Sequence, residues 1–171
     1  MTRLLSALTQ IALLRKDPSI LPSSGASVVA FVVAYAVADL VIGRLAGFKP
    51  VLPRTALDLA LTLPFFWLLL ALTRRTHRFP QTVNAAFGVY VLLAPAISLL
   101  LLLLRVPGQS SDALVMIVNV SYAIFVIWYL LIVGHVLRSA LDTGLVTGFA
   151  IAVTWAVGSI AVSRSIFGAA A

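Results

Sequence analysis

Residues 83–104 read VNAAFGVYVLLAPAISLLLLLL and contain no charged side chain. An α-helix rises about 1.5 Å per residue, so about 20 apolar residues are enough to cross a hydrocarbon core of about 30 Å. This stretch therefore predicts a transmembrane helix.

Four further apolar stretches of similar length occupy residues 27–45, 56–72, 113–137 and 145–162. Hydrophobic residues make up 62% of the 171 residues and charged residues 10%, whereas soluble domains have roughly 45–50% and about 25%. The connections are short, which makes neighbouring helices antiparallel. We predict an all-α, polytopic membrane protein whose five transmembrane helices form a single domain over residues 23–171.

The N-terminal residues 1–22 have a different pattern. Leu4, Leu8 and Ile11 recur at helical spacing, and the charged residues and proline of residues 15–18 follow them. A cleavable signal peptide needs a small-residue cleavage site after its apolar region, and a charged cluster stands there instead. We expect a retained, short amphipathic helix that lies in the membrane interface or packs on the bundle, followed by a proline break.

The basic residues give the chain a formal charge of +7 and predict its orientation. With five crossings, the side of the N-terminus receives Arg3, Arg15, Lys16, Arg74, Arg75, Arg78 and Arg138, and the other side receives Arg44, Lys49, Arg54, Arg105 and Arg164. Cytoplasmic segments carry an excess of Lys and Arg. This bias predicts a cytoplasmic N-terminus and a periplasmic C-terminus, and the arginine-rich and alanine-rich composition favours a bacterial inner membrane.

Asp39 and Asp58 are the two acids inside apolar stretches, and the short connection between their helices places them near the same membrane face. An aspartate at the bilayer centre costs about 2.5–3.5 kcal/mol, so such acids usually face a partner or water. Arg54 precedes Asp58 by four residues, and Arg44 is close to Asp39. We expect this polar cluster to form salt bridges that fix the first helical hairpin. The alternative is an acidic site for a proton, a cation or a basic partner.

Polar and aromatic residues form a stripe along the fourth stretch. Ser121, Trp128 and His135 recur every seven residues, about two turns, and Asn119 lies just before them. We expect Trp128 to pack in the bundle, Asn119 to make an interhelical hydrogen bond and His135 to lie at the interface. The alternative makes His135 a proton relay or a metal ligand, together with His77.

Two features suggest how the helices pack and bend. Gly144, Gly148, Ala152 and Ala156 repeat every four residues, and this helix-packing face lets another helix approach closely, from this chain or from a second copy. Pro64 and Pro95 lie inside the second and third stretches, where proline commonly kinks a helix. We expect the kinks to shape the bundle; the alternative is that the two kinked helices line a cavity.

The basic loop with Arg74, Arg75 and Arg78 is a candidate site for lipid headgroups. Each basic residue close to an anionic membrane surface contributes about 1 kcal/mol of attraction. We therefore expect anionic membrane lipids as partners of this loop, in addition to its role in topology.

The stretch RFPQTVNAAFGVY, residues 78–90, leads to Pro95 inside the third helix. Together with the short N-terminal helix, the proline break and five crossings, this arrangement resembles the Yip1-domain family of small five-helix membrane proteins. The resemblance implies a five-helix bundle with a cytoplasmic N-terminus. The acidic and aromatic motif of the trafficking members of that family is not present, so the resemblance implies no role in vesicle traffic.

The sequence assembles no reaction centre. An enzyme needs a nucleophile with its base, a metal cluster or paired carboxylates across a cleft, and Ser98 and Ser121 have no histidine and acid at their depth. Cysteine is absent, as are a phosphate-binding loop and a nucleic-acid-binding motif. We expect no enzymatic activity, no cofactor, no metal and no nucleic-acid partner.

Two functions remain from different classes. The first is a non-enzymatic membrane protein that acts through protein or lipid interactions, as a Yip1-like scaffold or assembly factor, with a homo-oligomer or another membrane protein as its partner. The second is a small transporter or channel subunit that uses Asp39 and Asp58. A transporter should have a central cavity that one of these acids reaches, whereas a scaffold should have a dry core and an exposed seam.

Overall fold

The computed structural model describes residues 2–103 and 111–168, and within them it is all-helical, which confirms the predicted fold class. The elements are α1 (Thr2–Ala12), η1 (Pro18–Ile20), α2 (Gly25–Leu45), α3 (Val51–Leu72), η2 (Thr76–Arg78), α4 (Phe79–Leu103), α5 (Asp112–Leu141) and α6 (Leu145–Phe167). The predicted basic residue Arg105 lies outside the described residues.

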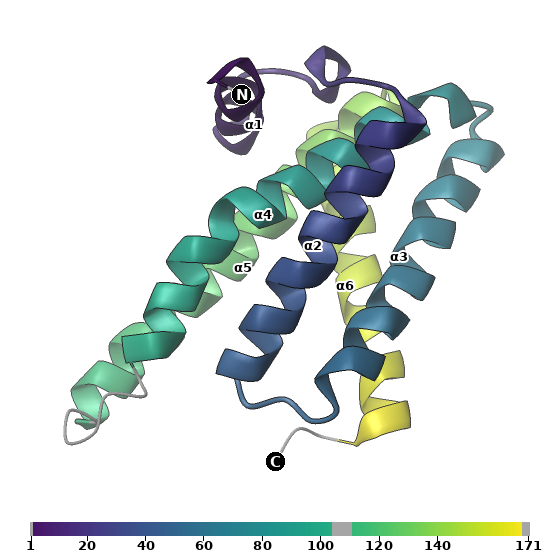
Figure 1. The fold of residues 1–171 in the computed structure, drawn as a ribbon. Coiled ribbons are helices and arrows are strands. Elements are labelled where there is room, and N and C mark those ends of the chain that lie inside the picture. The colour runs from purple at the N-terminus through teal and green to yellow at the C-terminus, as the bar shows by residue number, and fades with distance from the viewer. Residues whose placement is uncertain (1, 104–110, 169–171) are drawn as a thin grey trace.

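Helices α2 to α6 are each long and apolar enough to cross a membrane. The chain is therefore an integral membrane protein with a short extra helix, α1, at its N-terminus. Figure 1 shows α1, the α3–α4 connection and the α5–α6 connection at one end of the bundle, and the α2–α3 connection and the end of α6 at the other. This arrangement is the antiparallel succession that the short connections predict.

Each of the five membrane-spanning helices extends beyond its predicted stretch at one end or both, and α3 and α5 show why. Helix α3 begins at Val51 and not at residue 56, because Pro53 lies in its first turn, where a proline interrupts no helical hydrogen bond. Helix α5 continues to Leu141, where Asp142 adopts a left-handed conformation and its N–H bonds to the carbonyl of Arg138. His135 therefore lies almost two turns before the end of α5 and is buried, and its expected place at the membrane interface stays a prediction.

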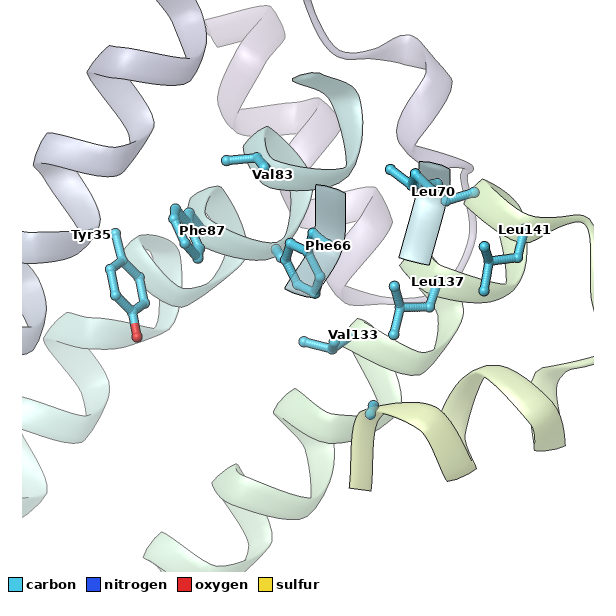
Figure 2. Close-up of a cluster of buried hydrophobic side chains, with 11 residues drawn as sticks. Tyr35, Phe66, Leu70, Val83, Phe87, Val133, Leu137 and Leu141 are labelled. Atoms are coloured by element: carbon cyan, nitrogen blue, oxygen red, sulfur yellow. The ribbon is translucent and has the colours of Figure 1, made fainter. Parts of the chain in front are cut away.

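The main hydrophobic core lies where α3, α4 and α5 meet α2. Figure 2 shows this cluster, with Tyr35 from α2, Phe66 and Leu70 from α3, Val83 and Phe87 from α4, and Val133, Leu137 and Leu141 from α5. Packing between membrane helices relies on close van der Waals contact, because lipid tails are as apolar as the side chains. The aromatic and branched side chains of this cluster supply that contact.

The predicted small-residue face is used within the chain, between α6 and α5. A Cβ atom on Gly148 would overlap the carbonyl oxygen of Gly134, and one on Gly134 would lie 2.7 Å from the Cα atom of Phe149. Ala152, one turn further along α6, is buried as well. Gly144, in contrast, caps the start of α6 in open space. The face therefore binds α6 to α5, which leaves Gly148 no room for a second copy.

The N-terminal segment is attached to α4 and α5 by a series of hydrogen bonds to its carbonyl oxygens. Trp128 Nε1 donates to Ala12 O at 3.0 Å, His135 Nε2 lies 3.1 Å from Lys16 O, Gln81 Nε2 donates to Ser19 O at 3.3 Å and Asn84 Nδ2 donates to Pro22 O at 2.8 Å. Leu8 and Ile11 are buried against α4 and α5. Of the two positions expected for this helix, the structure shows the one packed on the bundle.

Candidate intramembrane binding site

The two intramembrane aspartates accept hydrogen bonds from hydroxyl groups of neighbouring helices. Asp39 on α2 accepts from Thr55 Oγ1 of α3 at 2.5 Å and from the Tyr90 hydroxyl of α4 at 3.0 Å. Asp58 on α3 accepts from the Tyr35 hydroxyl of α2 at 2.5 Å. The acids thus link three helices, and both are partly buried.

The predicted salt bridges between these acids and Arg44 and Arg54 are wrong. The ion pairs between described residues both involve Asp142, at the opposite end of the bundle. Arg54 donates to Gly168 O at 3.4 Å, and its guanidinium lies 5.1 Å from the centre of the Phe167 ring. A long arginine side chain extends toward the membrane interface while its stem stays on the apolar surface, which carries the charge away from Asp58.

A cavity of about 210 Å³ lies between all five membrane-spanning helices, and Asp58 is part of its wall. Eight of the other eighteen wall residues are aromatic. The rings come from Tyr35, Phe66, Phe87, Tyr90, Tyr122, Phe125, Tyr129 and Trp155. Thr62 and Ser159 add hydroxyl groups. Asp58 is the single acidic side chain in the described wall, and no basic side chain lies there with it.

The aromatic rings form a connected layer that fixes the shape of the cavity. The Tyr35 ring is stacked on Phe87, with ring centres 4.3 Å apart, and lies 4.6 Å from the ring of Tyr90. Tyr90 and Tyr129 meet edge to face at 5.6 Å. Such pairs are favoured by about 0.5–1.5 kcal/mol beyond the area that they bury. The wall is therefore preorganised, and the Tyr35 hydroxyl that contacts Asp58 is held by its own ring contacts.

The cavity is open where α5 and α6 separate. The two helices touch at Gly134 and Gly148 and diverge toward the end opposite α1 (Figure 1). On that side the wall contains Tyr122 and Val126, each 40% exposed, and the half-buried Ser159. The cavity wall therefore reaches the outer surface of the bundle at these residues.

The two helix prolines do not face this cavity. Pro64 and Pro95 are exposed and absent from its wall, although their helices, α3 and α4, both contribute residues to it. The two proline-containing helices thus line a cavity, as the alternative had it, although the prolines themselves lie outside its wall.

The polar stripe on α5 is divided between two roles. Trp128 and His135 contact the carbonyls of the N-terminal segment, and His135 is only 4% exposed. Ser121 is half-buried, whereas Asn119 is exposed. Asn119 makes no hydrogen bond with another described residue, so the interhelical hydrogen bond that we expect is not formed within the described chain.

The basic loop is held by the neighbouring connection through two of its three arginines. Arg75 and Arg78 form ion pairs with Asp142, and Arg78 also donates to Ser139 O at 2.8 Å. The hydrogen bond from Arg78 and the charge of both arginines hold the pKa of Asp142 below its ordinary value. Arg74 is exposed in a left-handed conformation. It is the residue of this loop most open to lipid headgroups.

Within residues 2–103 and 111–168, no group of three or more metal-ligating side chains lies close enough together to hold a metal ion.

The hydroxyl groups that donate to Asp39 and Asp58 were not predicted from the sequence. Tyr35 precedes Asp39 by one helical turn, a spacing that could have marked it, but it bonds to Asp58 on another helix. No family model, curated protein or solved structure matches the chain.

Proposed function

We propose that this membrane protein binds a small solute in the cavity around Asp58 and acts as a small transporter or channel subunit. The observation that supports this function best is that a carboxylate reaches a cavity between five helices whose described wall contains no basic side chain. Intramembrane acids commonly mark solute or ion pathways. Small-molecule sites are likewise concave, mostly apolar and equipped with a few polar groups.

The hydrogen bonds of Asp58 favour a binding role over a purely structural one. Tyr35 engages Oδ2 of the carboxylate and fixes its orientation without neutralising its charge. A structural salt bridge would have satisfied the charge inside the protein. No such salt bridge to Asp58 forms among the described residues. A bound cation or proton therefore has a clear electrostatic role at this position.

The proposal is tested by thiol accessibility in the natural cysteine-free background. Ser159→Cys places a thiol in the cavity wall, Val157→Cys places one on the 62% exposed, lipid-facing side of α6, and Ser165→Cys places one near the helix end. We expect small water-soluble methanethiosulfonate reagents to modify the cavity and helix-end positions, and to leave position 157 unmodified. A cavity position as unreactive as the lipid-facing one would contradict the proposal.

The Yip1-like scaffold is a second candidate function, and Asn119 supports it. This amide is exposed about two turns inside α5, beside the exposed Met116 and Val120. Amide side chains commonly join membrane helices to each other. A partner helix on this face predicts that crosslinking through Asn119→Cys yields a specific adduct in native membranes, while Trp67→Cys, on the exposed face of α3, yields none.

We further propose a bacterial inner-membrane location with a cytoplasmic N-terminus and a periplasmic C-terminus. The support is the charge bias together with the position of α1, the basic loop and the α5–α6 connection at one end of the bundle (Figure 1). Positively charged segments remain in the cytoplasm during insertion. Arg74 and its neighbours would then meet the anionic lipids of the inner leaflet. Fusion reporters at each terminus test this orientation.

A further inference from the structure

The chemistry of the cavity wall selects one class of solute. The face of an aromatic ring is electronegative and attracts a cation within about 6 Å of its centre. Eight of the nineteen residues in the described cavity wall carry such rings, and Asp58 supplies the one carboxyl group. An anion would meet repulsion from both, and an uncharged apolar molecule would leave the carboxylate without a positively charged partner. The favoured solute therefore carries a positive charge on an apolar surface.

A bare metal ion fits this wall poorly. Ca²⁺ takes about six to eight oxygen ligands and Mg²⁺ requires near-octahedral oxygen coordination. The wall offers one carboxylate, already engaged by Tyr35, and otherwise mainly carbon. An organic ammonium ion needs no such shell, because its methyl and methylene groups carry part of the charge and contact the ring faces directly.

The volume limits the size of the ion. A cavity of about 150 Å³ is enough for benzene, and pockets for drug-sized molecules have about 300–1,000 Å³. The cavity here measures about 210 Å³. It therefore accepts a compact ammonium ion with a few carbon atoms and excludes large lipophilic cations.

We propose that the cavity binds a small organic ammonium ion, with the charged nitrogen against Asp58 and the attached carbons against the rings of Tyr129 and Trp155. This inference rests on the proposed solute-binding function and specifies its substrate class. The half-buried Trp155, whose ring is stacked on Phe65 at 4.2 Å, offers a fixed aromatic surface from α6. Tyr129 offers a second one from α5.

The test compares two water-soluble probes of the same shape, choline and its uncharged isostere 3,3-dimethylbutan-1-ol, on the full chain in lipid nanodiscs. We expect choline to slow the modification of Ser159→Cys in a saturable manner, and the isostere to require at least about a tenfold higher concentration, which corresponds to 1.4 kcal/mol. Ser165→Cys is the matched control, because both serines donate a hydrogen bond to the carbonyl three residues earlier on α6. Its modification should not respond to either probe.

Substitutions identify the groups that recognise the charge. Asp58→Asn should weaken protection by choline at least about tenfold and leave the effect of the isostere unchanged, since only the charge interaction is removed. Trp155→Leu should weaken choline and Trp155→Phe should retain most of its effect, because phenylalanine keeps a ring. Asp112→Asn, which removes an exposed acid at the start of α5, should change nothing.

The outcomes separate this inference from the function on which it rests. If Ser159→Cys is modified but choline protects no better than its isostere, the ammonium assignment is wrong and a solute cavity remains. If Ser159→Cys is not modified at all, both proposals fail. The comparison of the two probes on the Ser159→Cys protein decides the question even if Asp58→Asn does not fold.

Discussion

The hydroxyl of Tyr35 on α2 lies 2.5 Å from a carboxylate oxygen of Asp58 on α3. This bond joins the two helices inside the membrane-spanning region. It also aligns the carboxylate beside the cavity. Structure and proposed binding therefore depend on the same pair of residues.

Removing the Tyr35 hydroxyl should destabilise the fold. Tyr35→Phe keeps the stacked ring but leaves the Asp58 oxygen without its donor, which costs about 1–3 kcal/mol for a buried group. Tyr129→Phe is the matched control, because its hydroxyl makes only a long bond of 3.4 Å to Ala86 O. Unfolding in mixed micelles should show a clearly larger loss for position 35, and equal losses would argue against an important Tyr35–Asp58 bond.

A methyl group at Gly148 should disrupt the contact between α5 and α6. Gly148→Ala would place Cβ 2.9 Å from the backbone nitrogen of Arg138 and closer still to Gly134 O, and such overpacking typically costs about 1–3 kcal/mol. Gly158→Ala lies on the same helix with no atom near its new Cβ. That control should be neutral or slightly stabilising, by up to about 1 kcal/mol, because alanine favours helix. Thermal unfolding of both variants measures the difference.

Loss of the Trp128 indole should loosen the N-terminal segment. The indole N–H satisfies the carbonyl of Ala12 at the end of α1, where a helix has no partner of its own. Trp128→Phe should therefore speed tryptic cleavage at the exposed Arg15 and Lys16 several-fold. Trp67→Phe, at a 54% exposed position on α3, should leave the cleavage rate unchanged. Unchanged cleavage in the Trp128 variant would show that the apolar contacts of α1 suffice.

The contribution of Asp142 to stability should depend on pH. Its pKa in the folded chain lies below the ordinary value of 3.8. The unfolded state therefore binds the proton more readily, and the stabilisation is fully present above pH 3.8 and lost as the pH falls through the folded pKa. Asp142→Asn should lower the unfolding temperature at pH 7 and approach the natural protein below pH 3.8. A constant difference over that range would contradict the charge interaction with Arg75 and Arg78.

The arginines of the basic loop should separate into two classes. Arg78→Gln removes the bonds to Ser139 O and Asp142, so it should lower thermal stability. Arg74→Gln should leave stability unchanged and weaken binding to anionic nanodiscs by about 1 kcal/mol, since Arg74 is exposed. Comparing the association of anionic and of neutral lipids with the protein in nanodiscs measures the second effect. Equal lipid binding by the Arg74 variant would limit this residue to topology.

The sequence predicted the number of membrane-spanning helices well because each one needs a long apolar run, and that requirement is local. It also placed Gly148 and Ala152 on a packing face, because residues four apart lie on one side of a helix. The ends of α3 and α5 were less predictable. Whether Pro53 falls in a first turn, or Asp142 becomes a left-handed cap, depends on the connections as well as on the apolar pattern.

By itself, the sequence determined the class of this protein, its helices and the presence of two acids within them. The tertiary structure alone decided which groups those acids meet. Spacing along the chain favoured Arg54 as the partner of Asp58, but the packing of α2 beside α3 brought Tyr35 to it and left Arg54 near Phe167. Hydrogen bonds between helices depend on rotation and crossing angle, which long-range packing sets and local sequence does not encode.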